Sequence, residues 1–228
     1  MPSESCRMKT LKSISLGVVS LLFLTIGFIS CSNDNEDYVF PSLLSEFADV
    51  STNADGRFDY LLTDEGQKLE IVNSAEIEVE GVTPDTVYRT LSRYELMDGG
   101  VRLYSLQAIP LLYPKPQNAF PEGVKADPLT LQSLWRGGGY LNMIVQVKAQ
   151  TGKHVFLVVE DSLASSPAGG HTLFLRLYHD AGDDVQAYTQ KAYYSIPLSP
   201  YASSMSSGDV IVMDIPTETG WQRWTREF

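Results

Sequence analysis

Cysteine is nearly absent from this chain, which has two in 228 residues. Cys6 lies in an N-terminal segment that we expect to be removed, and Cys31 is expected to carry lipid. The folded part would then have no thiol for a disulfide, a thiolate nucleophile or a cysteine-ligated zinc ion. Its stability therefore has to come from an ordinary apolar core.

Sequence signatures of catalysis and cofactor binding are also missing. The chain has no Gly-x-Ser-x-Gly, His-Glu-x-x-His or phosphate-binding glycine loop, and Gly137-Gly138-Gly139 lacks the Lys and Ser/Thr that follow in a P-loop. A carboxylate pair for glycoside hydrolysis leaves no such signature and stays open. We predict a protein that is not an enzyme, with no catalytic residue and no cofactor, and keep an unrecognised hydrolase as an alternative.

Only three histidines are present: His154, His171 and His179. On one strand His171 and His179 would lie roughly 26 Å apart, so they cannot share a metal ion. His154 could approach one of them, but a site with two histidines would still need acidic ligands. The carboxylates of residues 180–184 lack the spacing of a calcium loop. We therefore predict no metal site and interpret the histidines as polar residues at strand ends.

Basic residues are outnumbered, with 17 Lys and Arg against 28 Asp and Glu, a net charge of −11. The first thirty residues contain three basic residues and one acidic one, so the remainder carries about −13. A field of this sign repels phosphate backbones and anionic lipid. Nucleic acid is therefore not an expected partner.

The N-terminus is organised as a secretory signal peptide, predicted over residues 1–30. Arg7, Lys9 and Lys12 precede an uncharged apolar run over residues 14–29, and Met8 is an alternative start. The run is about sixteen residues, shorter than the roughly 20 of a spanning helix. An uncleaved anchor is the alternative reading.

Cys31 directly follows the apolar run, and the sequence around it resembles a bacterial lipobox. We predict that Cys31 is the lipid-attachment site and that several acyl chains, palmitate among them, hold the protein on a membrane. The acidic residues 31–40 form a solvated tether. They also resemble the export tag of surface lipoproteins in Bacteroidota-type bacteria, so we expect an outer-membrane lipoprotein that can be exposed at the cell surface. The alternative is that these acidic residues form a plain linker.

The mature chain alternates apolar and polar residues with period two, as in residues 76–80, 141–148 and 173–177. Helical periodicity is nearly absent, and 127–135 is the one helical candidate. Glycine-containing turns at 54–56, 64–66, 98–100 and 151–153 predict hairpins. Five prolines between residues 110 and 128 predict a linker over 114–125, because proline cannot donate to a strand ladder. We predict an all-β chain with a small barrel over 41–113 and an antiparallel β-sandwich over 126–228.

Several stretches resemble the NigD-like lipoproteins of Bacteroidota-type bacteria. They are the acidic tether, Asp55-Gly56-Arg57, Leu62-Thr63-Asp64-Glu65-Gly66, Trp135-Arg136-Gly137-Gly138-Gly139-Tyr140-Leu141-Asn142, Tyr193-Tyr194-Ser195-Ile196-Pro197-Leu198 and Gly220-Trp221. Their order carries the resemblance, which covers nearly the whole mature chain. It implies an OB-like N-terminal barrel, a C-terminal β-sandwich and a role related to bacteriocin immunity, and it brings no catalytic residues.

Two functions follow from these features. The first is a non-enzymatic envelope module that binds an unknown protein. The alternative is a carbohydrate-binding accessory lipoprotein of a glycan-uptake system, in which an exposed tryptophan stacks on a sugar. Trp221 and Trp224 would point to opposite faces of a strand, so at most one of them belongs to the core.

Replacing Cys31 by Ala tests the membrane anchor. The variant should leave the membrane fraction and appear in the soluble fraction, because no basic patch can replace the acyl chains. Immunoblotting of fractionated cells measures the distribution, with Ser32→Ala as the matched control. A Cys31→Ala protein that stays with the membranes would refute the lipoprotein reading.

Overall fold

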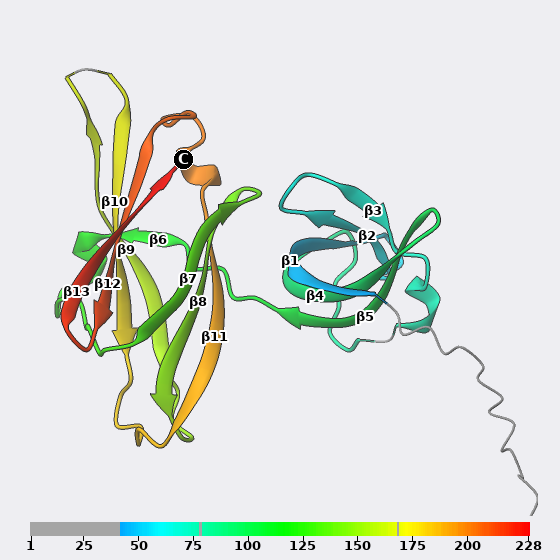
Figure 1. Cartoon of the computed structure of the whole chain (residues 1–228), viewed down its shortest axis with the longest axis horizontal. Helices are drawn as coiled ribbons and strands as arrows, with labels where there is room; N and C mark the ends of the chain where they lie inside the picture. Colours follow the sequence, from blue (N-terminus) through cyan, green and yellow to red (C-terminus); the bar gives the residue numbers. More distant parts are fainter. Residues whose placement is uncertain (1–41, 78, 168) are drawn as a thin grey trace, which may run out of the picture. The chain divides into compact units, whose positions relative to one another are not determined.

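The computed structural model describes residues 42–77, 79–167 and 169–228. The predicted signal peptide, Cys31 and the whole of the tether lie outside these residues. The described residues form β-strands and short 3₁₀ helices (Figure 1), which confirms the all-β prediction. No helix among them is long and apolar enough to cross a membrane. The strands are β1 Leu43–Thr52, β2 Phe58–Thr63, β3 Lys68–Glu70, β4 Val87–Met97, β5 Gly100–Ala108, β6 Pro114–Pro116, β7 Thr130–Gly137, β8 Tyr140–Ala149, β9 Val155–Ser165, β10 His171–Asp180, β11 Tyr188–Pro197, β12 Val210–Thr217 and β13 Gly220–Glu227.

The first five strands form one antiparallel sheet in the order β3-β2-β1-β4-β5. Its apolar face closes around a small core of Ala48, Val50, Phe58, Leu61, Ile71, Tyr94, Val101 and Leu103. The two edges meet at a single parallel bridge between Ile71 and Val101. Beside it, the Asn73 amide donates to the Leu103 carbonyl and accepts from its N–H, both at 2.9 Å.

The predicted small barrel is therefore an open sheet whose edges touch, and no continuous ladder within the described part of the chain closes it. The cause is the length of β3, which has three residues before the chain turns into the 3₁₀ helix Ser74–Glu76. The Asn73 side chain supplies backbone-like hydrogen bonds where a longer strand would have paired.

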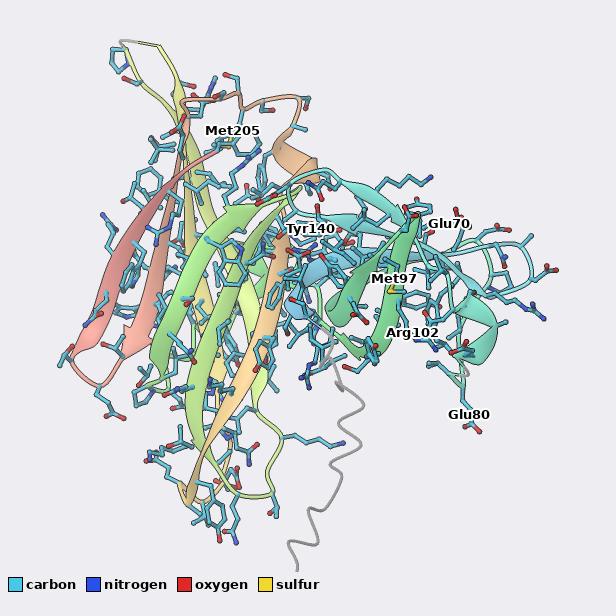
Figure 2. The ribbon with its side chains drawn as sticks, turned by 45° about the vertical axis from the view of Figure 1, so that its right-hand side comes forward. Glu70, Glu80, Met97, Arg102, Tyr140 and Met205 are labelled. Atoms are coloured by element: carbon cyan, nitrogen blue, oxygen red, sulfur yellow. The ribbon has the colours of Figure 1, made fainter. Side chains whose placement is uncertain are left out.

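The remaining strands form a β-sandwich. One sheet has the order β13-β12-β10-β9-β6 and the other the order β11-β8-β7. Period-two alternation places Leu173, Leu175 and Leu177 of β10 in the interior, against Leu141 and other apolar residues of β8. Met205, in the segment that connects β11 to β12, is also buried in this core (Figure 2).

Two local predictions were wrong. The helical candidate at 127–135 is largely strand β7, which pairs with β8. The turn at 151–153 is not a hairpin, because β8 and β9 belong to different sheets and the chain crosses between them. The turns at 54–56, 64–66 and 98–100 do join hairpin-paired strands.

The proline-rich segment differs from the predicted linker at its start. Pro114–Pro116 forms β6 and pairs in parallel with β9. The strand lies at the edge of its sheet, where proline is tolerated because only one side of the strand has to be hydrogen-bonded. A 3₁₀ helix, Gln117–Ala119, follows directly. The sandwich therefore begins within the segment expected to be a linker.

Candidate functional site

A buried arginine connects the N-terminal sheet to the sandwich. Arg89 extends from β4, and its side chain is 1% exposed. Asp64, which follows β2, receives two hydrogen bonds or ion contacts from the guanidinium, with Nη1–Oδ1 at 2.7 Å and Nη2–Oδ2 at 2.8 Å. Asp49 of β1 lies 3.2 Å from Nη1. A bidentate pair of this kind fixes the orientation of the guanidinium as well as its charge.

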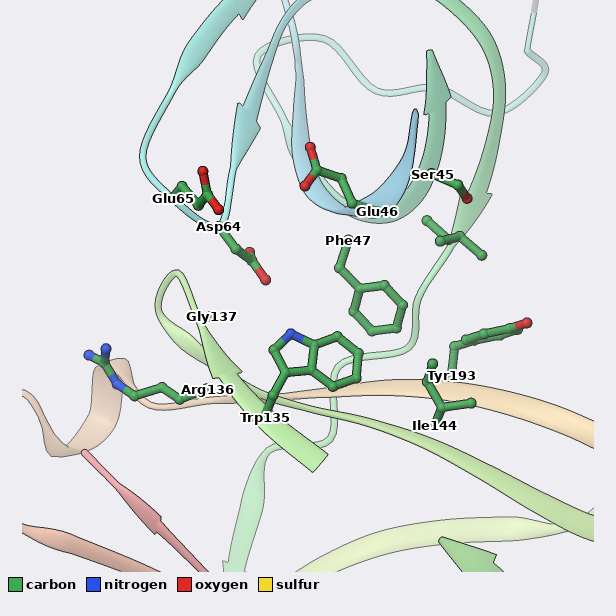
Figure 3. A pocket seen from close by; sticks show the side chains of 11 residues that line it. Ser45, Glu46, Phe47, Asp64, Glu65, Trp135, Arg136, Gly137, Ile144 and Tyr193 are labelled. Carbon is green, nitrogen blue, oxygen red and sulfur yellow. The ribbon is translucent and has the colours of Figure 1, made fainter. Parts of the chain in front are cut away.

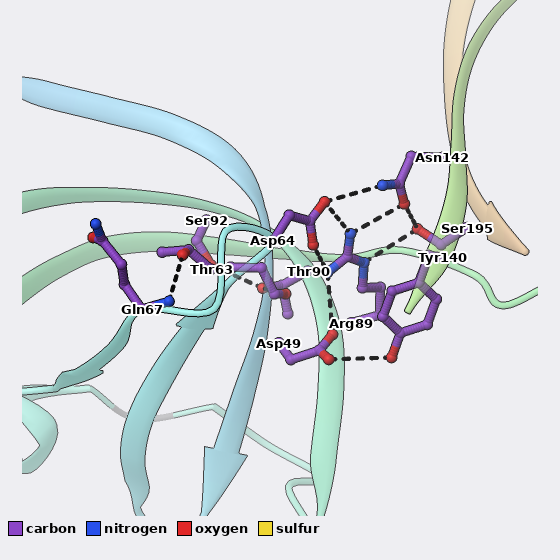
Figure 4. Close-up of polar contacts among 11 residues, drawn as sticks. Asp49, Thr63, Asp64, Gln67, Arg89, Thr90, Ser92, Tyr140, Asn142 and Ser195 are labelled. Atoms are coloured by element: carbon purple, nitrogen blue, oxygen red, sulfur yellow. Dashed lines mark hydrogen bonds and ion pairs between the residues drawn. The ribbon is translucent and has the colours of Figure 1, made fainter. Parts of the chain in front are cut away.

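The other donors of Arg89 reach the sandwich (Figure 4). Nη2 donates to the amide oxygen of Asn142 on β8 at 3.0 Å, and Nε donates to the Ser195 hydroxyl on β11 at 3.2 Å. Ser195 donates to the same Asn142 oxygen at 2.7 Å, and the Asn142 amide donates to Asp64 at 3.0 Å. The Tyr140 ring lies 4.2 Å from the Arg89 Cζ atom. We call Asp49, Asp64, Arg89, Tyr140, Asn142 and Ser195 the arginine centre.

The centre has one cation and two carboxylates. Burial raises the pKa of Asp49, while the Arg89 charge and hydrogen bonds from Arg89 and Tyr140 act in the opposite direction. Burial, and then the charge of Asp49, raise the pKa of Tyr140 to about 12, so its hydroxyl remains a donor to Asp49. Removing one partner of such a buried pair typically costs about 3–5 kcal/mol, because the other charge is left uncompensated.

The glycine run at 137–139 allows Asp64 to approach the sandwich. A Cβ atom on Gly137 would overlap the Asp64 carboxylate, and one on Gly138 would lie 2.9 Å from Asp64 Oδ1. Gly138 also has a φ of 56° and donates its N–H to the Asp64 carbonyl at 3.0 Å. A Cβ on Gly139 would meet nothing within 4 Å. The run is thus a docking surface for the β2–β3 turn.

A cleft of about 420 Å³ lies beside the arginine centre (Figure 3). Phe47 of β1 packs against Trp135 of β7 and Tyr193 of β11, with ring centroids 5.0 and 6.1 Å apart and interplanar angles of 57° and 67°. Phe47 is buried, whereas Trp135 and Tyr193 are partly exposed. The remaining lining residues are Ser45, Glu46, Asp64, Glu65, Leu91, Arg136, Gly137 and Ile144.

The histidines are placed elsewhere. His154 and His179 meet at one end of the sandwich, with Nδ1 and Nε2 2.8 Å apart. The other ring nitrogens contact the Asp127 carbonyl and the Asp184 carboxylate. His171 pairs with Asp209. Among the described residues, no group of three or more His, Cys, Asp or Glu side chains could hold a metal ion.

Burial lowers the pKa of His179, the dominant effect on that ring. Asp184 accepts hydrogen bonds from the N–H groups of Gln150 and Thr151, and bonds of this kind are the main reason why its pKa is strongly lowered. These contacts hold the chain where it crosses from β8 to β9. We therefore assign this cluster to the packing of the sandwich end.

The tryptophans of β13 do point to opposite sides. Trp221 is 45% exposed, whereas Trp224 packs against the sandwich core. The Trp224 indole N–H is buried and has no hydrogen-bond partner among the described residues. Trp221 and Arg223 are two residues apart on β13 and so share its outer face. There Arg223 forms a bidentate pair with Asp214 of β12.

Sequence reasoning did not single out Arg89 or Phe47. The signal that could have found them was indirect. Two stretches that carry the family resemblance, 62–66 and 135–142, supply Asp64, Tyr140 and Asn142, which all contact Arg89.

Gly137→Ala tests whether Gly137 lies as close to the Asp64 carboxylate as the structure shows. The new methyl group must displace the Asp64 carboxylate from Arg89, so we expect a loss of about 1–3 kcal/mol of unfolding free energy. Gly139→Ala is the matched control and should change it by less than about 0.5 kcal/mol. Urea unfolding measures both, and equal effects of the two substitutions would contradict the docking.

Comparison with known proteins matches the chain to one family. The NigD-like C-terminal beta sandwich domain model matches residues 114–227, half of the chain. No curated protein sequence matches. A crystal structure of a NigD-like immunity protein from Bacteroides caccae is 33% identical, with a TM-score of 0.64, and covers 83% of this chain and 94% of that one.

Two more distant structures share the fold. A protein of unknown function, DUF1344, from Bacteroides vulgatus is 15% identical with a TM-score of 0.65, covering 82% of this chain and 91% of its own. A proposed lipoprotein from Bacteroides fragilis is 12% identical with a TM-score of 0.53, and the match covers 81% of this chain and 97% of that one. The family model and the Bacteroides caccae structure confirm the resemblance drawn from the sequence: the chain belongs to the NigD-like family.

Proposed function

We propose that this chain is a non-enzymatic lipoprotein of the cell envelope that binds a partner protein in the cleft beside the arginine centre. The observation that carries the proposal is the construction of that cleft. Its walls come from the N-terminal sheet and the sandwich, and Arg89 holds the two together with a fully buried side chain. Binding sites occur preferentially at such junctions between structural units.

The contents of the cleft support binding rather than catalysis. Aromatic rings form one wall, and they are the side chains most enriched where proteins bind one another. Three carboxylates line the cleft: Asp64 is engaged by Arg89, Glu46 accepts a hydrogen bond from the Tyr94 hydroxyl, and Glu65 is exposed on the β2–β3 turn. None of the described residues that line the cleft is a histidine, and the two histidines that contact each other belong to the sandwich end.

A role related to immunity is the most specific form of the proposal. The Bacteroides caccae protein, 33% identical, is named as a NigD-like immunity protein. By analogy, the partner would be a secreted antibacterial protein that this chain captures before it acts. The lipid on Cys31 and the acidic tether would keep the binding module at the outer membrane, facing the outside, where such a protein arrives.

A carbohydrate-binding role is the second candidate, and one observation favours it. Trp221 is exposed on the outer face of the sandwich, beside the Arg223–Asp214 pair, and could stack on a sugar ring. Loss of glycan-array binding in Trp221→Ala would promote this role over protein binding.

Site-specific photo-crosslinking in living cells tests the proposed binding site. A benzophenone side chain at Ser45, which is exposed and lines the cleft, should give a discrete adduct with a protein. The same group at Ser204, exposed on the segment before β12, is the control and should give none. Immunoblotting detects the adduct. Absence of an adduct at Ser45, or the same adducts at both positions, would rule out the cleft as the binding site.

A further inference from the structure

The cleft contains negative charge that the protein does not neutralise. Glu65 is exposed on the β2–β3 turn and has no ion pair among the described residues. Two arginines belong to or adjoin the cleft, and each has another contact. Arg89 is enclosed by the arginine centre, and the Arg136 guanidinium lies 5.8 Å from the centroid of the Phe228 ring. Figure 3 shows the Arg136 side chain extending away from Trp135 and Phe47.

The aromatic wall adds a second attraction for a cation. Phe47 meets Trp135 and Tyr193 at steep angles, so neither ring lies flat against it. The rings of Trp135 and Tyr193 both remain partly exposed, and both line the cleft. The face of an aromatic ring is electronegative, and tryptophan attracts a cation most strongly.

We propose that the cleft binds the side chain of an arginine or lysine on the partner protein, an inference that rests on the proposed function. The cation would lie against the ring of Trp135, with Glu65 as its counter-ion. Arginine is favoured over lysine, because its planar guanidinium can stack on a ring and also pair with a carboxylate in two places. A volume of about 420 Å³ falls within the range of ligand pockets.

The charge of the whole chain acts in the same direction. Its net charge of −11 draws basic proteins toward it and repels acidic ones. A phosphate or carboxylate group in the cleft would face three carboxylates, those of Glu46, Asp64 and Glu65, and a single cationic lining residue, Arg136. A neutral sugar could stack on Trp135 without using the charge, so a sugar serves as a test of the alternative.

The test uses the mature chain without lipid and a blocked Gly-Arg-Gly peptide as the probe. Titration is followed by NMR through the indole N–H signals of the three tryptophans. The Trp135 signal should shift in a saturable way, while those of Trp221 and Trp224 stay in place. The isosteric citrulline peptide, which is neutral, should bind at least about tenfold more weakly. Raising the salt concentration should weaken the binding of the arginine peptide and leave that of the citrulline peptide unchanged.

Glu65→Gln should lose most of the preference for arginine over citrulline, whereas Glu218→Gln, an exposed residue on the β12–β13 turn, should retain it. Equal binding of the two peptides, no shift at Trp135, or a comparable shift with maltotetraose would overturn the proposal. A protein adduct at Ser45 without peptide binding would refute the cation alone and leave the proposed function standing. Peptide binding without any adduct would support the cation site and refute the proposed function.

Discussion

The guanidinium of Arg89 determines how the N-terminal sheet and the sandwich fit together. It extends from near the start of β4, buried by Asp49 and Asp64 on one side and by Tyr140, Asn142 and Ser195 on the other. A buried cation is costly unless every donor is paired, and here all three guanidinium nitrogens have acceptors. Those acceptors come from both the N-terminal sheet and the sandwich. If the two moved apart, some of the Arg89 donors would therefore lose their acceptors.

The cleft is a consequence of that contact. Holding Asp64 against Gly137 brings the β2–β3 turn, with Glu65, over the start of the sandwich. The same contact places Phe47 between Trp135 and Tyr193. Phe47 is buried there, whereas Trp135 and Tyr193 remain partly exposed. A site made by two units in this way is defined by their docking, which the arginine centre holds.

Period two in the sequence was enough to predict the all-β class and the sandwich, because alternation reports directly which face of a strand is buried. Hairpins at 54–56, 64–66 and 98–100 followed from glycine turns between alternating runs. The turn at 151–153 has the same local pattern, yet it crosses between sheets. Local sequence cannot separate the two cases, since the difference lies in which strands β8 and β9 pair with. The short β3 also escaped prediction, so the open edge of the N-terminal sheet was unexpected.

The candidate site was harder to predict for a similar reason. Arg89 reads as an ordinary polar residue of an alternating strand, and its partners are up to 106 positions away in the chain. Gly137 was interpreted as permitting a sharp turn, whereas its role is to leave room for a carboxylate from another unit. Only the family resemblance pointed to the right stretches, and it did so without saying that they touch.

The claim that Arg89 joins the two units is tested most directly by a double-mutant cycle with Asn142. Unfolding free energies of Arg89→Ala, Asn142→Ala and the double variant give the coupling between a β4 side chain and a β8 side chain. The account predicts a coupling of about 1 kcal/mol or more, because each residue satisfies the other in a buried network. Single effects that add to within about 0.3 kcal/mol would show that the two units are held together by something else.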